Sequence, residues 1–91
     1  MYSVLYTKTA LQDLQNIEKF ISKDNICYAY KVVETIFHAA NNLSLFPYLG
    51  KEMFDRSGLR EIVEPSFGYR IFYMFADKKI YILTIGKYRN M

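Results

Sequence analysis

Two consecutive apolar runs near the carboxyl end constrain the fold of this chain most strongly. The runs are Tyr69–Ala76 (YRIFYMFA) and Ile80–Ile85 (IYILTI), and both are rich in β-branched and aromatic residues, a composition typical of strands. Only a short link around Asp77 and Lys78 joins them. Because a link of this length connects antiparallel neighbours, the pair predicts the centre of an antiparallel sheet.

The first half of the chain has helical periodicity instead. Apolar residues recur at steps of three and four over Leu11–Ile21 and again over Ile26–Leu43, which places one apolar stripe on each of two helices. The first stripe comprises Leu11, Leu14, Ile17, Phe20 and Ile21. The candidate N-caps are Thr7 or Thr9 for the first helix and Asp24 or Asn25 for the second. The short link between the helices predicts an antiparallel helical hairpin.

Two weaker β signals complete the predicted order. Tyr2–Tyr6 is a short β-prone run, and Leu59–Glu64 alternates as a strand after a polar loop at residues 51–58. The order is therefore β-α-α-β-β-β, an α+β fold in which the helical hairpin packs on one face of a mainly antiparallel sheet. A chain of 91 residues has the length of one domain, so residues 1–91 are expected to form a single unit.

The second face of the predicted sheet needs its own cover. In the run 69–76, one face carries Tyr69, Ile71, Tyr73 and Phe75, and the other carries Arg70, Phe72, Met74 and Ala76. Both faces are largely apolar, yet one helical hairpin covers only one of them, and an uncovered apolar face usually marks a binding surface. Two alternatives remain: the amino-terminal strand and the 51–58 loop wrap over this face, or the protein self-associates through it.

Composition excludes several classes of protein. Hydrophobic residues make up 52% of the chain, which excludes intrinsic disorder. No run of 18 apolar residues occurs, so no membrane span is expected. Cys27 and His38 are the only residues of their types, too few for the usual metal sites. They stand 11 residues apart on the second predicted helix, about three turns, so no Cys-His catalytic pair is expected. We therefore expect no metal and no cofactor, and the lone cysteine indicates a cytoplasmic protein.

The net charge of +3 lies entirely in residues 48–91, because residues 1–47 carry four basic and four acidic side chains. The chemistry-bearing groups of the second half are Arg60, Arg70, Lys87 and Arg89, together with Tyr69, Tyr73 and Tyr88. Arginine binds phosphate or carboxylate through two parallel hydrogen bonds, so this set is suited to an anionic partner or to RNA cleavage without a metal. Alternatively, the arginines pair with Glu61 or Glu64 across strands and the tyrosines fill the core.

The order of short motifs along the chain resembles the ParE/RelE superfamily, the toxins of bacterial type II toxin–antitoxin pairs. The motifs are Ala10-x-x-Asp13-Leu14-x-x-Ile17, Leu45-x-Pro47-x-x-Gly50, Leu59-Arg60-Glu61, Gly68-Tyr69-Arg70-Ile71-x-Tyr73 and Ile80-x-Ile82-Leu83-x-Ile85-Gly86-Lys87-x-Arg89. The resemblance implies a helical hairpin against an antiparallel sheet. It also implies a cognate antitoxin that wraps the toxin in a hetero-oligomer.

The resemblance implies one of two targets. RelE-like members cut messenger RNA on the ribosome, and their site residues would correspond here to Arg70, Lys87, Tyr88 and Arg89. ParE-like members poison DNA gyrase. RelE-like relatives carry lysines in the strand where this chain has Glu61 and Val63, which favours the ParE-like side. On that hypothesis Arg60, Arg70, Lys87 and Arg89 contact the target or the antitoxin, and Tyr73 belongs to the core. A non-toxic binding module of the same fold is the third hypothesis.

Overall fold

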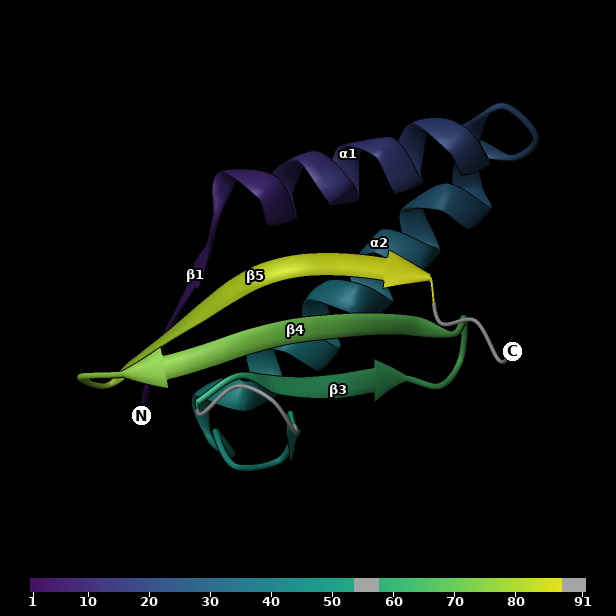
Figure 1. Ribbon diagram of the computed structural model, residues 1–91. Coiled ribbons are helices and arrows are strands. Elements are labelled where there is room, and N and C mark those ends of the chain that lie inside the picture. Colours follow the sequence, from purple (N-terminus) through teal and green to yellow (C-terminus); the bar gives the residue numbers. More distant parts are fainter. Residues whose placement is uncertain (54–57, 88–91) are drawn as a thin grey trace.

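A five-stranded sheet runs through the part of the chain that the computed structural model describes, residues 1–53 and 58–87 (Figure 1). Its strands are β1 (Ser3–Tyr6), β2 (Lys51–Glu52), β3 (Arg60–Glu64), β4 (Tyr69–Ala76) and β5 (Lys79–Lys87). They lie in the order β1-β5-β4-β3-β2. β1 pairs with β5 in parallel, and every other pairing is antiparallel. The predicted antiparallel pair β4–β5 is thus the centre of the sheet.

Two capped helices precede most of the sheet: α1 (Lys8–Ser22) and α2 (Ile26–Asn41), followed by the short 3₁₀ helix η1 (Asn42–Ser44). Thr7 caps α1, because its Oγ1 accepts a hydrogen bond from the backbone N–H of Ala10 at 3.2 Å. Asn25 caps α2 by accepting from the N–H of Tyr28 at 2.9 Å. Both N-caps are among the predicted alternatives, and they begin each helix by satisfying donors that have no partner inside it.

The core lies between these helices and one face of the sheet. Its fully buried members are Ala10, Val32, Ile36, Ala40 and Leu43 from the helical part and Ile71, Tyr73, Ile80 and Ile82 from β4 and β5. α1 contacts β5, and α2 passes behind the strands and contacts β3 (Figure 1). Each fully buried aliphatic side chain contributes about 1.5–3 kcal/mol. Tyr73 lies in the core, as predicted.

Asp13 fastens α1 to the sheet where β1 ends. One carboxylate oxygen accepts hydrogen bonds from the backbone N–H of Ile85 at 2.9 Å and from the hydroxyl of Thr84 at 2.5 Å. At the start of α1, the Thr7 hydroxyl donates to the carbonyl of Ile82 at 2.8 Å. Thr7 and Asp13 therefore continue the hydrogen bonding along the edge of β5 past the point where the short strand β1 ends.

Three details differ from the sequence predictions. Lys51 and Glu52, predicted to lie in a loop, form β2, a strand so short that only its pairing with β3 reveals it. β5 continues beyond the predicted run Ile80–Ile85 through Gly86 and Lys87. Phe20, predicted in the apolar stripe, is 73% exposed, because the last turn of α1 extends past the sheet (Figure 1).

The second face of the sheet is only partly covered by the described residues. On β4, Arg70 and Phe72 are half-buried, and Met74 and Ala76 are exposed. β1 joins the edge of the sheet beside β5 and does not cross this face, so the wrapping alternative fails for the amino-terminal strand. The other wrapping segment, the 51–58 loop, falls partly outside the described residues. Within the described ranges, no helix has the length and hydrophobicity needed to cross a bilayer.

Candidate functional site

Arg70 lies on the face of the sheet opposite the helices. Its Nε forms an ion pair with Oε2 of Glu61 on the neighbouring strand, and its guanidinium carbon lies 5.0 Å from the centre of the Phe72 ring. The register explains the pair: Glu61 stands opposite Phe72, so it is the diagonal neighbour of Arg70 on the same face. Arg70 thus pairs with Glu61 across strands, one of the two arrangements expected from the sequence.

Arg60 lies on the helix-side face instead, since it stands opposite the buried Tyr73 in the register of β3 and β4. Its Nη1 donates to the carbonyl oxygen of Gly50 at 2.7 Å. The guanidinium carbon is 5.0 Å from the Tyr48 ring centre and 5.8 Å from that of Phe75, distances at which a cation is attracted to an aromatic face. Arg60 therefore fastens the segment before β2 to the end of the sheet.

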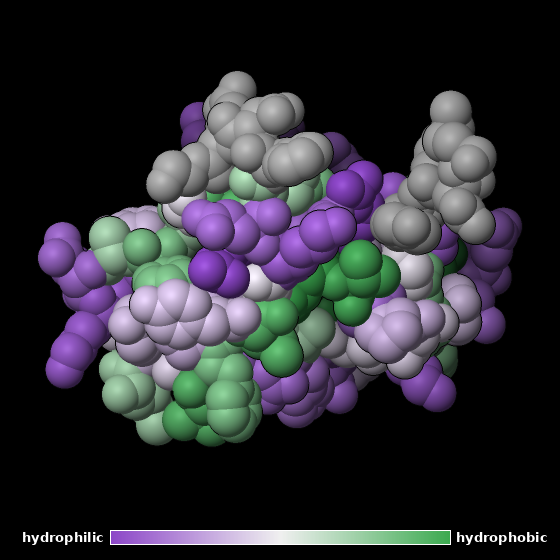
Figure 2. Space-filling model, turned by 60° about the horizontal axis from the view of Figure 1, so that its bottom comes forward, coloured by the Kyte–Doolittle hydropathy of each residue, from purple (hydrophilic) through white to green (hydrophobic). Residues whose placement is uncertain are grey.

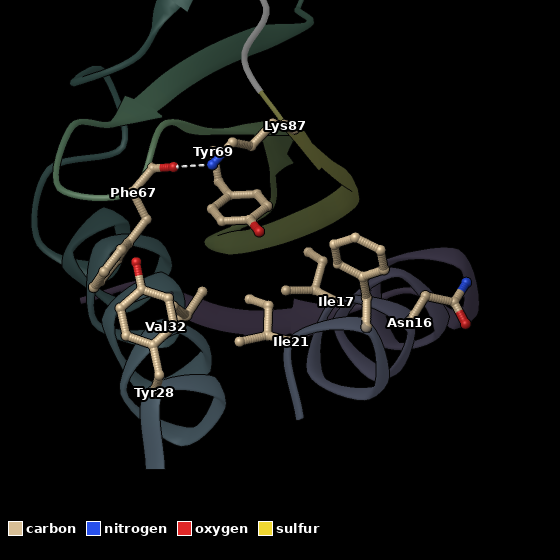
Figure 3. A pocket seen from close by; sticks show the side chains of 9 residues that line it. Asn16, Ile17, Ile21, Tyr28, Val32, Phe67, Tyr69 and Lys87 are labelled. Carbon is tan, nitrogen blue, oxygen red and sulfur yellow. Dashed lines mark hydrogen bonds between the residues drawn. The ribbon is translucent and has the colours of Figure 1, made fainter. Parts of the chain in front are cut away.

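Lys87 occupies the helix-side face at the other end of the sheet (Figure 3). Its Nζ donates to the carbonyl oxygen of Phe67 at 2.6 Å and lies 4.7 Å from the centre of the Tyr69 ring. The pKa of Tyr69 is raised, first by burial and second by the neighbouring Tyr28. Tyr69 is therefore a neutral phenol at physiological pH, and it forms part of the support for Lys87.

The described residues do not bring the predicted cations together. Arg70 faces away from the helices, whereas Arg60 and Lys87 face them from positions opposite Tyr73 and Tyr69, at different points along β4. Tyr88 and Arg89 lie outside the described residues. Catalysis of phosphodiester cleavage requires acid, base and charge-stabilising groups around one phosphate, and Arg60, Arg70 and Lys87 do not meet that geometric condition.

A hollow of about 470 Å³ opens beside Lys87, between the helical hairpin and the sheet (Figure 3). Its lining is Asn16, Ile17, Phe20, Ile21, Tyr28, Val32, Phe67, Tyr69 and Lys87. The Tyr28 and Phe67 rings meet edge to face with centres 5.5 Å apart. Mostly apolar walls with one ammonium suit an apolar side chain that has a carboxylate nearby. Helical periodicity did not reveal this hollow, because it marks apolar positions without showing which of them extend past the sheet.

The described residues contain no group of three or more His, Cys, Asp or Glu side chains arranged to hold a metal ion. Cys27 is a free, exposed thiol at the start of α2. His38, on the same helix, is exposed as well. Residues 1–53 and 58–87 thus offer ion pairs, phenols and apolar contacts, together with one thiol and one imidazole.

The comparisons with known proteins agree with this fold. Residues 4–91 match the family described as the ParE toxin of type II toxin–antitoxin systems, parDE. Among solved structures, the chain is similar to one from the chromosomal ParDE toxin–antitoxin system of P. aeruginosa, with a TM-score of 0.84, 22% identity and 98% of each chain covered.

The fold also extends to RelE-type toxins. Isolated E. coli RelE matches with a TM-score of 0.74 and 18% identity, over 100% of this chain and 88% of that one. A chain of the RelBE2 toxin–antitoxin complex of Mycobacterium tuberculosis matches with a TM-score of 0.69 and 23% identity, over 97% and 98%. A search of curated protein sequences gives no significant match. Because the family match spans nearly the whole chain, the resemblance seen in the sequence is confirmed: this chain belongs to the ParE toxin family of type II toxin–antitoxin systems.

Proposed function

We propose that this toxin arrests growth by binding DNA gyrase, and that a cognate antitoxin neutralises it. The family and the fold support a toxin with a protein antitoxin. The separation of Arg60, Arg70 and Lys87 on the sheet is the observation that favours gyrase over messenger RNA. A protein target can be bound through separate contacts, whereas RNA cleavage needs them gathered at one phosphate.

The ion pair of Arg70 with Glu61 is a second observation against RNA cleavage. In a RelE-like site this arginine would stabilise the negative charge that builds up on the cleaved phosphate. Here Glu61 already supplies a carboxylate to its Nε. The Glu61 carboxylate offsets part of the guanidinium charge and would repel a phosphate that approached the same group, so Arg70 is poorly suited to this role.

The test measures both activities of the same protein. Purified toxin is titrated into a gyrase supercoiling assay, and message breaks are mapped after the toxin is induced in cells. We expect inhibition of supercoiling and an intact message. Uninhibited supercoiling at saturating toxin would refute the proposal, and breaks lost in Arg70→Ala would favour the ribosome-dependent endonuclease. Expression without growth arrest would favour the non-toxic binding module.

For the antitoxin, the hollow beside Lys87 is the proposed contact. Its apolar lining suits an apolar anchor, and Lys87 suits a neighbouring carboxylate. Phe20→Ser removes an exposed ring from its rim and is expected to weaken co-purification with the cognate antitoxin. Tyr30→Ser, a similarly exposed aromatic on α2 outside the hollow, is the matched control. Equal retention by both variants would contradict this assignment.

A further inference from the structure

A second apolar surface lies far from the hollow, in the loop that follows η1. Leu45, Phe46, Tyr48 and Leu49 are each between 59% and 69% exposed, and we call them the 45–49 patch. Figure 2, which brings the bottom of Figure 1 forward, shows hydrophobic side chains gathered on this side of the molecule among hydrophilic ones. Four large apolar side chains in five consecutive positions form a surface of the kind that marks an interaction site.

The backbone beneath this patch is held by the buried Tyr73 and the partly buried Arg60. The Tyr73 hydroxyl donates to the carbonyl of Pro47 at 2.7 Å and accepts from the N–H of Gly50 at 2.8 Å. Arg60 donates to the carbonyl of Gly50 at 2.7 Å. The N–H of Leu49 donates to the carbonyl of Phe46 at 3.0 Å, which closes a turn with Pro47 at its second position. The loop is therefore a fixed platform.

An exposed apolar surface with an ordered backbone is well suited to binding another protein. Because its backbone is already ordered, binding loses less conformational entropy than it would in a flexible loop. Tyr48 is further oriented by the edge of Phe75, with ring centres 5.0 Å apart. Rigid aromatic and aliphatic anchors of this kind supply most of the energy of many interfaces.

The charges around the patch are mainly positive. Arg60 touches Tyr48. The backbone of Tyr2 and Ser3 bonds Ser44 on one side and Lys78 on the other, which brings the basic turn between β4 and β5 to the same end of the sheet. The described cations at this end are Arg60, Lys51, Lys78 and Lys79. The described carboxylates are Glu52, Asp77 and Glu61, and Glu61, opposite Lys51, is already paired with Arg70. A partner surface rimmed by carboxylates is electrostatically complementary.

The same features disfavour other occupants. A symmetric contact with a second copy would bring the two sets of cations face to face. Single-stranded RNA stacks on aromatic rings, but Leu45 and Leu49 offer it no ring.

We propose that the 45–49 patch docks this toxin on an apolar, carboxylate-rimmed surface of its protein target. The inference rests on the proposed function, under which that surface belongs to gyrase.

The test replaces single exposed side chains and measures gyrase directly. Phe46→Glu and Leu49→Glu introduce a negative charge into the patch without removing a core side chain. Ile26→Glu makes the same change at a residue that is 74% exposed at the start of α2. We expect both patch variants to raise the half-inhibitory toxin concentration in the supercoiling assay by about tenfold or more. The control should inhibit as the wild type does, and melting followed by circular dichroism should show that all three fold.

The outcomes separate the two proposals. If the wild type inhibits gyrase and the folded patch variants inhibit equally well, the patch assignment is wrong and the gyrase proposal stands. If the wild type does not inhibit gyrase, both fail. Patch-dependent binding of a single-stranded RNA probe, or a patch-dependent dimer in analytical ultracentrifugation, would assign the surface to one of the other occupants and overturn the inference.

Discussion

Gly50→Ala tests whether the Tyr73 hydroxyl fixes the loop before β2. A Cβ at Gly50 would lie 2.6 Å from both Cε1 and Oη of Tyr73 and 2.9 Å from the carbonyl oxygen of Glu61. Tyr73 is fully buried and cannot move aside, so the loop must shift and lengthen the hydrogen bonds to Pro47 and Gly50. Overpacking costs about 1–3 kcal/mol and each of the two lost hydrogen bonds about 1 kcal/mol, a total of about 3–5 kcal/mol.

Urea unfolding at 25 °C, followed by circular dichroism, measures this loss. A chain of this length has a total stability of about 5–14 kcal/mol, so the change is large enough to resolve. Gly86→Ala is the matched control, since a Cβ there meets nothing within 4 Å, and its effect should stay below about 1 kcal/mol. In a Tyr73→Phe background the hydroxyl is already absent, so Gly50→Ala should cost less. A Gly50→Ala protein as stable as the wild type, or strictly additive costs, would refute the reasoning.

Three further changes test other contacts. Asp13→Ala leaves the half-buried N–H at Ile85 without its acceptor and should lower the free energy of unfolding by about 1–3 kcal/mol, whereas Glu34→Ala, at an exposed position, should change it little. Lys78→Gly should raise the free energy of unfolding by about 1 kcal/mol, measured the same way, because Lys78 has a φ of 62° that glycine adopts without strain. Burial raises the pKa of Tyr6 to about 12, above an unfolded value of about 10. Its contribution to stability is therefore present below about pH 10 and is lost as the pH rises toward 12, and urea titrations should show a smaller alkaline decline in Tyr6→Phe.

The sequence predicts most of the fold because its strongest signals are local. Helical periodicity and polar caps define α1 and α2, and alternation defines β4 with the boundaries that the structure has. β2 escapes prediction because two residues carry no periodicity, and their strand conformation depends on pairing with β3. Phe20 escapes because periodicity assigns a face of a helix and cannot tell where the partner sheet ends.

The candidate site is harder to predict for the same reason. Arginine at positions 60 and 70 can be read directly from the sequence, but the face that each occupies depends on the register between β3 and β4. The register sets Arg60 opposite Tyr73 and Val63 opposite Arg70. The 45–49 patch consists of large apolar side chains of the kind that are usually buried. Their exposure is explained only by the structure, in which Tyr73 and the turn at Pro47 hold the backbone beneath them.

The parity of the register also limits what chemistry the sheet can perform. Side chains alternate between faces along a strand, and Val63, the partner of Arg70, stands three positions after Arg60. Arg60 and Arg70 therefore lie on opposite faces, and no rotamer change brings them together through the sheet. On the face of the sheet that carries Arg70, its neighbours on β3 and β4 are Glu61, Val63 and Phe72. The one ionisable group among these three neighbours is the Glu61 carboxylate, which is already paired with Arg70. Only a register shift of one residue would bring Arg60 and Arg70 to one face. That shift would turn Ile62 away from the core against which it packs, so the stability of the fold opposes bringing these two arginines together.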